Sequence, residues 1–176
     1  VLIHPGASAP SRRYPEEGFA RAAEGIAALG CHVAFTGAAD EAPLVESIRT
    51  RMRTPSLSLA GRLTLPELCA AIEAATLVVS NNTGPAHIAA ALGVPVVDLY
   101  ALTNPQHPPW MTEARVLFHD VPCRYCYKSV CPAGHHDCLR KVAPEAVVAA
   151  ARDLLETRSG RRSTIAVVPA IPAIAG

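Results

Sequence analysis

The chain has few aromatic residues, almost no net charge and no long apolar run, and each shortage excludes a class of protein. Aromatic side chains make up 5% of the 176 residues, and the formal net charge is +1. A nearly neutral chain has no bulk attraction for nucleic acid or for an anionic membrane surface. No apolar run reaches the length of a membrane span and no signal peptide is recognisable, so we expect a cytoplasmic protein.

Two common nucleotide-binding motifs are missing as well. The sequence contains neither G-x-G-x-x-G nor G-x-x-x-x-G-K-[ST], which disfavours dinucleotide-dependent dehydrogenases and P-loop enzymes. An initiating methionine is also absent, and Val1–Ile3 already has the pattern of a strand inside a domain. We therefore expect the chain to be the second half of a longer protein.

Half of the residues are apolar, which is enough for one domain with a core. Short β-branched runs predict strands at residues 1–3, 32–36, 56–59, 77–79, 94–99 and 115–118. Apolar residues at helical spacing predict helices at residues 15–29, 42–53, 64–75, 85–92 and 144–155. This alternation predicts an α/β fold, a Rossmann-like parallel sheet with helices on both faces, over residues 1–157. The Pro- and Ala-rich residues 158–176 show no convincing element, and we expect a poorly ordered tail.

The stretch Leu77–Val96 has the pattern of a strand, a tight turn, a helix and a second strand. The turn, Ser80–Gly84, brings a hydroxyl group, two amides and backbone N–H groups to the start of a helix that Gly93 ends. Because a helix N-terminus carries partial positive charge, this arrangement is typical of a phosphate-binding site. Taken alone, a Thr-Gly pair at a helix start is more often a simple cap.

Other polar loops follow the remaining strands, and the carboxyl ends of parallel strands meet at one edge of a sheet. They add cationic side chains at Arg12 and Arg13, a carboxylate at Glu41 and an imidazole at His87. Each of these alone is ordinarily a surface charge or a helix-terminal residue. Together they fit a nucleoside diphosphate, because a carboxylate can accept hydrogen bonds from both ribose hydroxyl groups.

Six motifs occur in a fixed order: His4-Pro-Gly-Ala-Ser8, Arg12-Arg-Tyr-Pro15, Gly37-Ala-Ala-Asp-Glu41, Leu59-Ala-Gly-Arg-Leu-Thr-Leu65, Ser80-Asn-Asn-Thr-Gly-Pro-Ala-His87 and Ala91-Leu-Gly-Val-Pro95. With these motifs the chain resembles glycosyltransferase family 9, the ADP-heptose:lipopolysaccharide heptosyltransferases and their relatives. The resemblance runs from Val1 to about Leu155 and concerns the C-terminal, donor-binding domain of the family's GT-B fold. It implies that the N-terminal acceptor domain is absent from this chain.

The resemblance implies donor-binding roles for residues of the first four motifs. Arg12 stands where the family usually has a lysine that contacts the phosphate and the sugar, and Ser8 lies in the loop before it. Glu41, with Asp40 as a competitor, would hold the ribose hydroxyl groups. Leu63 falls in the segment that lies along the adenine.

In the fifth motif, Thr83 and Gly84 match the residues that hold the diphosphate, and His87 matches the histidine beside it. Asn82 replaces what is often an aspartate in the family, which exchanges a negative charge for an amide. We count these four residues among the donor-binding candidates and assign no catalytic residue to this fragment.

The function implied is inverting transfer of heptose from ADP-heptose to a lipopolysaccharide core acceptor. In the family a carboxylate of the N-terminal half is proposed to take the acceptor's proton, so we expect this fragment alone to be inactive. The glycolipid acceptor would bind through the missing domain. Peripheral association of the full-length protein with the inner membrane is a further hypothesis. The alternatives are a non-catalytic nucleotide-binding module and another GT-B enzyme that uses a UDP-sugar.

Six cysteines fall into two groups. Cys31 and Cys69 lie in apolar contexts and are expected to be buried. The other four form a C-x2-C-x4-C-x6-C cluster next to His135 and His136, and they are Cys123, Cys126, Cys131 and Cys138. They could hold a structural zinc ion through four thiolates, or through three thiolates and one imidazole; disulfides and free thiols are the alternatives. No cofactor is required for the expected reaction.

Overall fold

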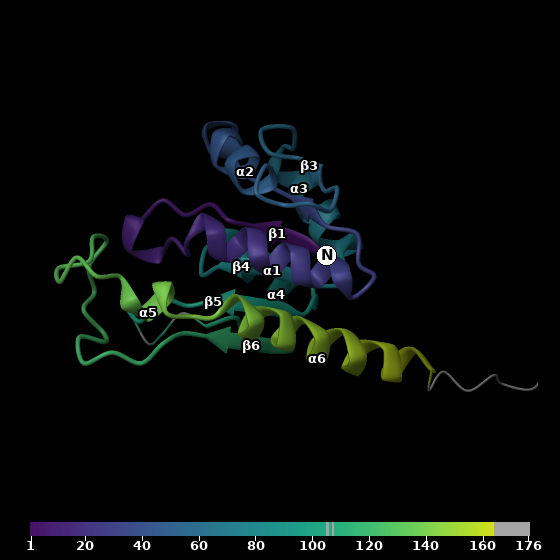
Figure 1. Ribbon diagram of the computed structural model, residues 1–176. Coiled ribbons are helices and arrows are strands. Elements are labelled where there is room, and N and C mark those ends of the chain that lie inside the picture. The colour runs from purple at the N-terminus through teal and green to yellow at the C-terminus, as the bar shows by residue number, and fades with distance from the viewer. Residues whose placement is uncertain (105, 107, 164–176) are drawn as a thin grey trace, which may run out of the picture.

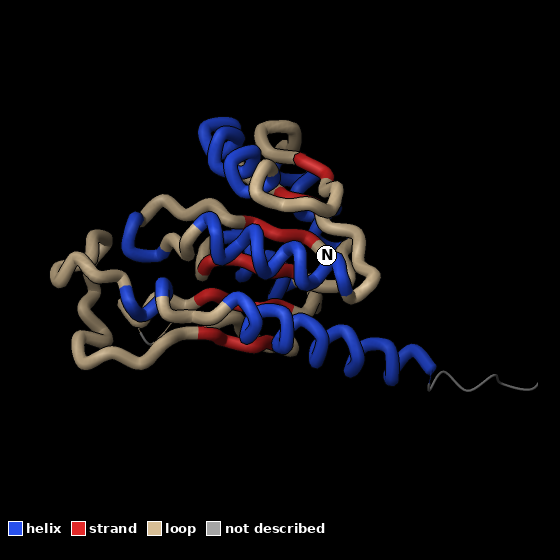
Figure 2. The backbone as a smooth tube through the Cα atoms, viewed as in Figure 1, coloured by secondary structure: helices blue, strands red, loops and turns tan. Residues whose placement is uncertain are grey.

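The computed structural model describes residues 1–104, 106 and 108–163. Figure 1 and Figure 2 show one sheet with helices on both of its faces. The strands are β1 (Leu2–His4), β2 (Ala34–Phe35), β3 (Leu57–Ser58), β4 (Val78–Asn81), β5 (Val96–Leu99) and β6 (Ala114–Leu117). The α-helices are α1 (Glu16–Ala28), α2 (Ala42–Arg49), α3 (Leu65–Ala74), α4 (Gly84–Ala91), α5 (Asp137–Arg140) and α6 (Pro144–Ser163), and the 3-10 helices are η1 (Pro10–Arg12) and η2 (Ala39–Glu41). The predicted α/β class is confirmed.

All neighbouring strands of the sheet run parallel, in the order β3-β2-β1-β4-β5-β6. The chain builds outward from β1 to one edge and then crosses back to place β4 on the other side of β1. The connection after β1 therefore runs toward one edge of the sheet and the connection after β4 toward the other, so the strand order switches direction between β1 and β4. In open parallel sheets such a switch point is where ligands bind, beyond the carboxyl ends of the strands.

Two apolar cores lie on opposite faces of the sheet. One packs α1, α2 and α6 against side chains such as Ile3 and Val79, and the other packs α3 and α4 against Leu2 and Val78. The alternation along β1 and β4 follows from the two-residue period of a strand, and both faces are apolar because both are covered.

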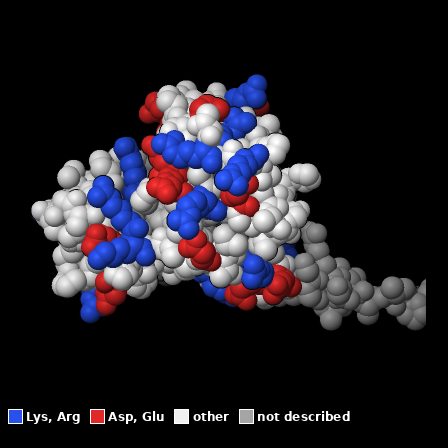
Figure 3. All heavy atoms as spheres, viewed as in Figure 1, with Lys and Arg blue, Asp and Glu red and all other residues white. Residues whose placement is uncertain are grey.

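Helix ends follow the local sequence signals. Gly30 and Gly93 take φ of +85° and +67° after α1 and α4, the left-handed conformation expected of a glycine at a helix end. At the start of α3, Glu67 Oε2 accepts hydrogen bonds from the Thr64 backbone N–H (2.7 Å) and hydroxyl group (2.6 Å). The exposed charges of the face that carries α1 are mixed in sign (Figure 3), as the near-neutral composition predicts.

Several predicted boundaries and burials are corrected by the structure. Helix α2 ends at Arg49, before the predicted end at residue 53, whereas α6 continues to Ser163. Residues 158–163 are thus helical instead of tail, and Arg158 Nη1 donates to Thr76 O (2.9 Å). The rest of the predicted tail, residues 164–176, lies outside the described residues. Cys31 and Cys69 are partly exposed and not fully buried.

None of the described helices combines the length and the apolar character that a membrane span needs.

Candidate functional site

A row of polar side chains crosses the sheet near the carboxyl ends of its central strands. His4 of β1 is in register with Ser80 of β4, and Ser80 is in register with Asp98 of β5. His4, Ser80 and Asp98 each follow, by two positions, an apolar residue that packs against α3 and α4. Because side chains two apart on a strand share a face, the row faces these helices. Thr36 extends it beyond β2, with its Oγ1 3.1 Å from His4 Nδ1. All four side chains are buried. The strands are therefore apolar along their length but carry buried hydrogen-bonding groups at their carboxyl ends.

A cavity of about 360 Å³ lies above the β1 end of this row, between the strand ends and the N-termini of α3 and α4. His4, Thr36 and Glu41 form its polar side. Its apolar side consists of Leu63, Leu65, Leu68, Pro85 and Ile88. The cavity has the usual make-up of a small-molecule site, which is an apolar wall with a few convergent polar groups. Three predicted donor-binding residues, Glu41, Leu63 and Gly84, meet here.

The Glu41 carboxylate is fixed at the floor of the cavity. Its Oε2 accepts a hydrogen bond from the Ala38 backbone N–H (2.8 Å) and lies 3.8 Å from His4 Nε2. Burial lowers the pKa of His4, and the neighbouring Glu41 charge opposes that shift. Asp40 is exposed and does not line the cavity, so the structure places Glu41 and not its neighbour at this position.

Two glycines make room for the Glu41 side chain. A Cβ atom at Gly6 would stand 2.0 Å from Glu41 Oε1, and one at Gly37 would stand 3.2 Å from Glu41 Cβ. Since side chains cannot approach so closely, any residue larger than glycine at position 6 displaces the carboxylate. The glycine in the motif after β1 thus sets the position of an acidic group 35 positions later in the sequence.

The N-terminus of α4 forms the other end of the site. Thr83 is the N-cap residue, but its Oγ1 donates to Asn81 O (3.2 Å) and does not cap the helix. A Cβ at Gly84 would meet no atom within 4 Å, so open space lies in front of the helix start. His87 is exposed in the first turn. This terminus leaves room for an anion, which the positive end of the helix favours.

The predicted residues of the loop after β1 lie outside the cavity lining. Ser8 is exposed and Arg12 is partly buried in η1. No carboxylate of the described chain pairs with the Arg12 guanidinium, whereas Arg13 Nε donates to Ala7 O (2.8 Å). The structure therefore brings neither Ser8 nor Arg12 into the lining of the cavity.

Asn82 does not line the cavity, and its side chain is hydrogen-bonded to a residue of β5. It is 6% exposed, and its Nδ2 donates to Asp98 Oδ2 (2.9 Å). Burial raises the pKa of Asp98 to about 7, although the hydrogen bond from Asn82 opposes the shift. Asp98 Oδ1 has no hydrogen-bond partner among the described residues. The structure therefore pairs Asn82 with a buried carboxyl group.

Asn81 and His4 also contribute to the site, although the sequence predicted Asn81 only as one of the two amides of the turn and His4 only as the first residue of a motif. Asn81 Oδ1 accepts from the Tyr14 backbone N–H (3.0 Å) and its Nδ2 donates to Pro5 O (2.7 Å), so it ties the loop after β1 to β4. The polar end of the strand was a signal for both residues. Their partners depend on strand register, which the sequence did not reveal.

The cysteine segment, residues 123–138, lies apart from the cavity. Cys123 Sγ is 3.5 Å from His135 Nε2, and Cys131 and Cys138 lie in the same segment. Burial raises the pKa of Cys138, while hydrogen bonds from four backbone N–H groups outweigh burial and lower that of Cys131. Within the described residues no three His, Cys, Asp or Glu side chains are arranged to hold a metal ion. The zinc hypothesis stays a prediction for elemental analysis.

Comparison with known proteins gives consistent results. The family model described as glycosyltransferase family 9 (heptosyltransferase) matches residues 1–136. Lipooligosaccharide heptosyltransferase 2 of Haemophilus influenzae is 32% identical over 158 residues, which are 86% of this chain and 46% of that protein. The enzyme of the same name from Campylobacter jejuni is 29% identical over 160 residues, or 88% of this chain and 50% of the relative.

Solved structures show the same correspondence. A family 9 glycosyltransferase from Veillonella parvula superposes with a TM-score of 0.79 at 30% identity, covering 89% of this chain and 46% of that one. The ADP-heptose lipopolysaccharide heptosyltransferase II of Escherichia coli gives 0.77 at 27% identity, covering 90% and 46%. The chain thus spans about half the length of the relatives that it matches.

Proposed function

Because this chain belongs to glycosyltransferase family 9, we propose that it is the donor-binding half of an inverting glycosyltransferase that transfers heptose from ADP-heptose to a lipopolysaccharide core acceptor. The observation that carries the proposal is the placement of Glu41, Leu63 and the start of α4 around one cavity at the strand switch point. That placement supplies one group for each part of a nucleotide: an apolar wall for the base, a carboxylate for the ribose and a helix N-terminus for the phosphate.

In this proposal the ribose binds at the floor of the cavity. The Glu41 carboxylate accepts hydrogen bonds from the two ribose hydroxyl groups, as acidic residues do in dinucleotide sites. Ala38 N–H already orients this carboxylate, and His4, whose pKa is lowered by burial, stays largely uncharged beside it. The adenine packs against Leu63 and the neighbouring apolar side chains.

The diphosphate would lie in the open space before Gly84, where the helix dipole favours negative charge. Arg12 would approach from the loop after β1, with its guanidinium free of protein carboxylates within the described chain. These groups stabilise the charge that grows on the diphosphate as the bond to the sugar breaks. This half therefore stabilises the leaving group, and the group that takes the acceptor's proton belongs to the other half.

Replacing Glu41 by Gln tests the ribose contact. Gln still accepts hydrogen bonds but lacks the charge, which costs about 1 kcal/mol for each of the two bonds, so E41Q should weaken ADP binding roughly 10- to 100-fold in calorimetry. E73Q is the matched control, because Glu73 is exposed on α3 and does not line the cavity; it should bind ADP as the unaltered chain does. Equal affinity of E41Q and the unaltered chain would contradict the assignment of the ribose site.

A thermal-shift comparison of ADP, UDP and GDP tests the identity of the base. We expect the largest stabilisation from ADP, because an extended apolar wall fits a purine. Selective stabilisation by UDP would favour an enzyme that uses a UDP-sugar, and the adenine assignment would be wrong. No stabilisation by any of the three would refute nucleotide binding by this half.

A further inference from the structure

A second and larger hollow, of about 660 Å³, lies on the opposite side of the loop that follows β1. It opens on the face covered by α1 and α2, whereas the cavity with Glu41 opens toward α3 and α4. The two hollows share no lining residue, since Pro5 and Glu16 line one and His4 and Glu41 the other. The proposed nucleotide contacts therefore leave this second hollow unoccupied.

One wall of the hollow is a loop held in place by hydrogen bonds. Arg13 Nε donates to Ala7 O (2.8 Å), and Asn81 bonds to the backbone of Tyr14 and of Pro5 on both sides of the loop. Proline residues line this wall, and their fixed φ angles limit its backbone further. A wall of this kind is formed before a ligand arrives, so little conformational entropy is lost on binding.

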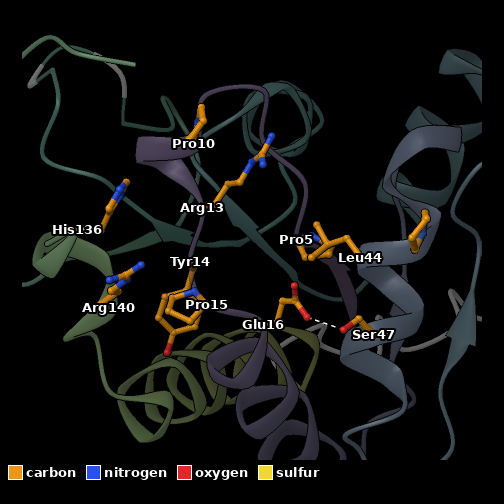
Figure 4. A pocket seen from close by; sticks show the side chains of 11 residues that line it. Pro5, Pro10, Arg13, Tyr14, Pro15, Glu16, Leu44, Ser47, His136 and Arg140 are labelled. Carbon is orange, nitrogen blue, oxygen red and sulfur yellow. Dashed lines mark hydrogen bonds between the residues drawn. The ribbon is translucent and has the colours of Figure 1, made fainter. Parts of the chain in front are cut away.

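The facing wall comes from the end of the cysteine segment and α5. The segment docks on the loop through Ser11, whose Oγ donates to Lys128 O (2.9 Å) and whose N–H donates to Ser129 O (3.0 Å). Tyr14 OH donates to Val142 O (2.8 Å) just after α5. These contacts hold His136 and Arg140 opposite Arg13, as Figure 4 shows.

The charges around the hollow do not cancel. Arg13 and Arg140 line it, and among the described lining residues the one carboxylate is Glu16. That carboxylate has partners other than Arg13 and Arg140: its Oε2 accepts from Ser47 Oγ (2.5 Å), which also lines the hollow, and lies 3.4 Å from Arg51 Nη1. No carboxylate pairs with Arg13 or Arg140 in the part of the chain that the structure describes. Two arginines thus line one hollow without a carboxylate partner among the described residues, and in Figure 4 the Arg13 side chain extends away from Arg140, along the wall of the hollow.

We propose that this hollow, between Arg13 and Arg140, is a second ligand site that binds the oxyanion group, phosphate or carboxylate, of a sugar-sized molecule. The guanidinium group is planar and presents paired N–H donors that match both kinds of oxyanion. The volume lies within the range of small-molecule sites and exceeds what a bare ion needs. The prolines and Leu44 provide apolar surface for the C–H faces of a sugar ring. This proposal does not depend on the identity of the nucleotide.

The test measures binding to the whole chain by calorimetry in the presence of saturating ADP, so that phosphate cannot report on the nucleotide cavity. The probes are inorganic phosphate, glucose 6-phosphate and gluconate. We expect at least one probe to bind, and the R13Q/R140Q variant to bind it at least tenfold more weakly. R53Q is the matched control, because Arg53 is exposed and does not line the hollow. It should bind the probe as the unaltered chain does.

The probes also separate the sources of the oxyanion. Tighter binding of glucose 6-phosphate than of inorganic phosphate supports a sugar phosphate, and tighter binding of gluconate supports a sugar acid. No binding of any probe would overturn the proposal, as would equal binding by R13Q/R140Q and R53Q. Because both variants leave Glu41 in place, retention of ADP binding shows that a negative result is not a folding failure and leaves the nucleotide proposal untouched.

Discussion

Asp98 is a carboxyl group without exposed surface, and it sits where a strand of the core would ordinarily carry an apolar residue. Its neighbours in the same face of the sheet are Ser80 and the amide of Asn82, so hydrogen bonding and not charge pairing surrounds it. Burial in such a setting disfavours the ionised form, which explains why its pKa rises to about 7. The folded chain therefore binds a proton that the unfolded chain has already released at pH 5 to 7.

This shift predicts an unusual pH dependence at the residue scale. The stability due to Asp98 is fully present below its ordinary pKa and is lost as the pH rises through about 7. Asn cannot ionise, so D98N should gain stability relative to the unaltered chain between pH 5 and pH 8, by roughly 2–4 kcal/mol. Urea denaturation of both proteins at the two pH values measures the gain.

D40N is the control for this prediction, because Asp40 is an exposed carboxyl group in η2. Its difference from the unaltered chain should change little between the two pH values. If D98N shows the same difference from the unaltered chain at pH 5 and pH 8, the buried carboxyl group does not titrate as the structure implies.

At the scale of elements, Tyr14, between the loop after β1 and α1, joins this part of the chain to the turn between α5 and α6 through a buried hydrogen bond. Tyr14 is 4% exposed, and its ring packs edge-on against Phe19 with centroids 5.2 Å apart. Its hydroxyl group donates to Val142 O, and burial, with the Glu145 charge, raises the pKa of Tyr14 to about 12. The phenol thus stays protonated, and can donate, above the pH at which an ordinary tyrosine ionises.

Removing the Tyr14 hydroxyl group should lower the stability of the folded chain, because the hydrogen bond to Val142 O is lost. Y14F leaves the Val142 carbonyl without its partner, and we expect a loss of about 1–3 kcal/mol in the free energy of unfolding. Chemical denaturation measures this loss. Y127F is the control, since Tyr127 is 63% exposed, and it should change stability by less than about 0.5 kcal/mol. A Y14F protein as stable as Y127F would show that Tyr14 and the turn between α5 and α6 are not energetically coupled.

The sequence predicted these elements to different extents, for physical reasons. Strands and helices with strong periodicity, such as β4, α4 and β5, were predicted because local signals and burial agree there. The end of α6 was missed because Gly160 and Pro- and Ala-rich neighbours give weak local signals. Helix η1 is a single turn, and a single turn leaves no periodic pattern to recognise.

The candidate site shows the same division. Glu41, Leu63 and Gly84 follow strands or open helices, so parallel topology alone brings them together. The turn of Asn82 toward Asp98 was not predicted, because it depends on the register of β5 beside β4. The role of Gly6 depends on a side-chain contact across 35 positions in sequence, which no local pattern records.

At the scale of the whole molecule, all the described groups of the candidate site come from one edge of a single sheet. The polar row, the cavity and the start of α4 all lie at the carboxyl edge of one sheet, while the relatives are about twice as long as this chain. Displacement at a sugar carbon requires an acceptor hydroxyl group and a base aligned with the leaving group. Of the described groups in the cavity, Glu41 would be hydrogen-bonded to the ribose and His4 is buried, so neither would be available as the base.

We therefore predict that the chain alone binds ADP but does not release ADP from ADP-heptose, even with a lipopolysaccharide core acceptor present. A coupled assay for ADP compares it with a longer protein in which a family 9 N-terminal half precedes the same sequence, and only the longer protein should turn over. In that protein E41Q should lower kcat/KM by the factor that it lowers ADP affinity, because the ribose contact is made in both ground and transition states. Turnover by the chain alone would mean that a proton acceptor lies among its own residues, and the division of labour between the two halves would be wrong.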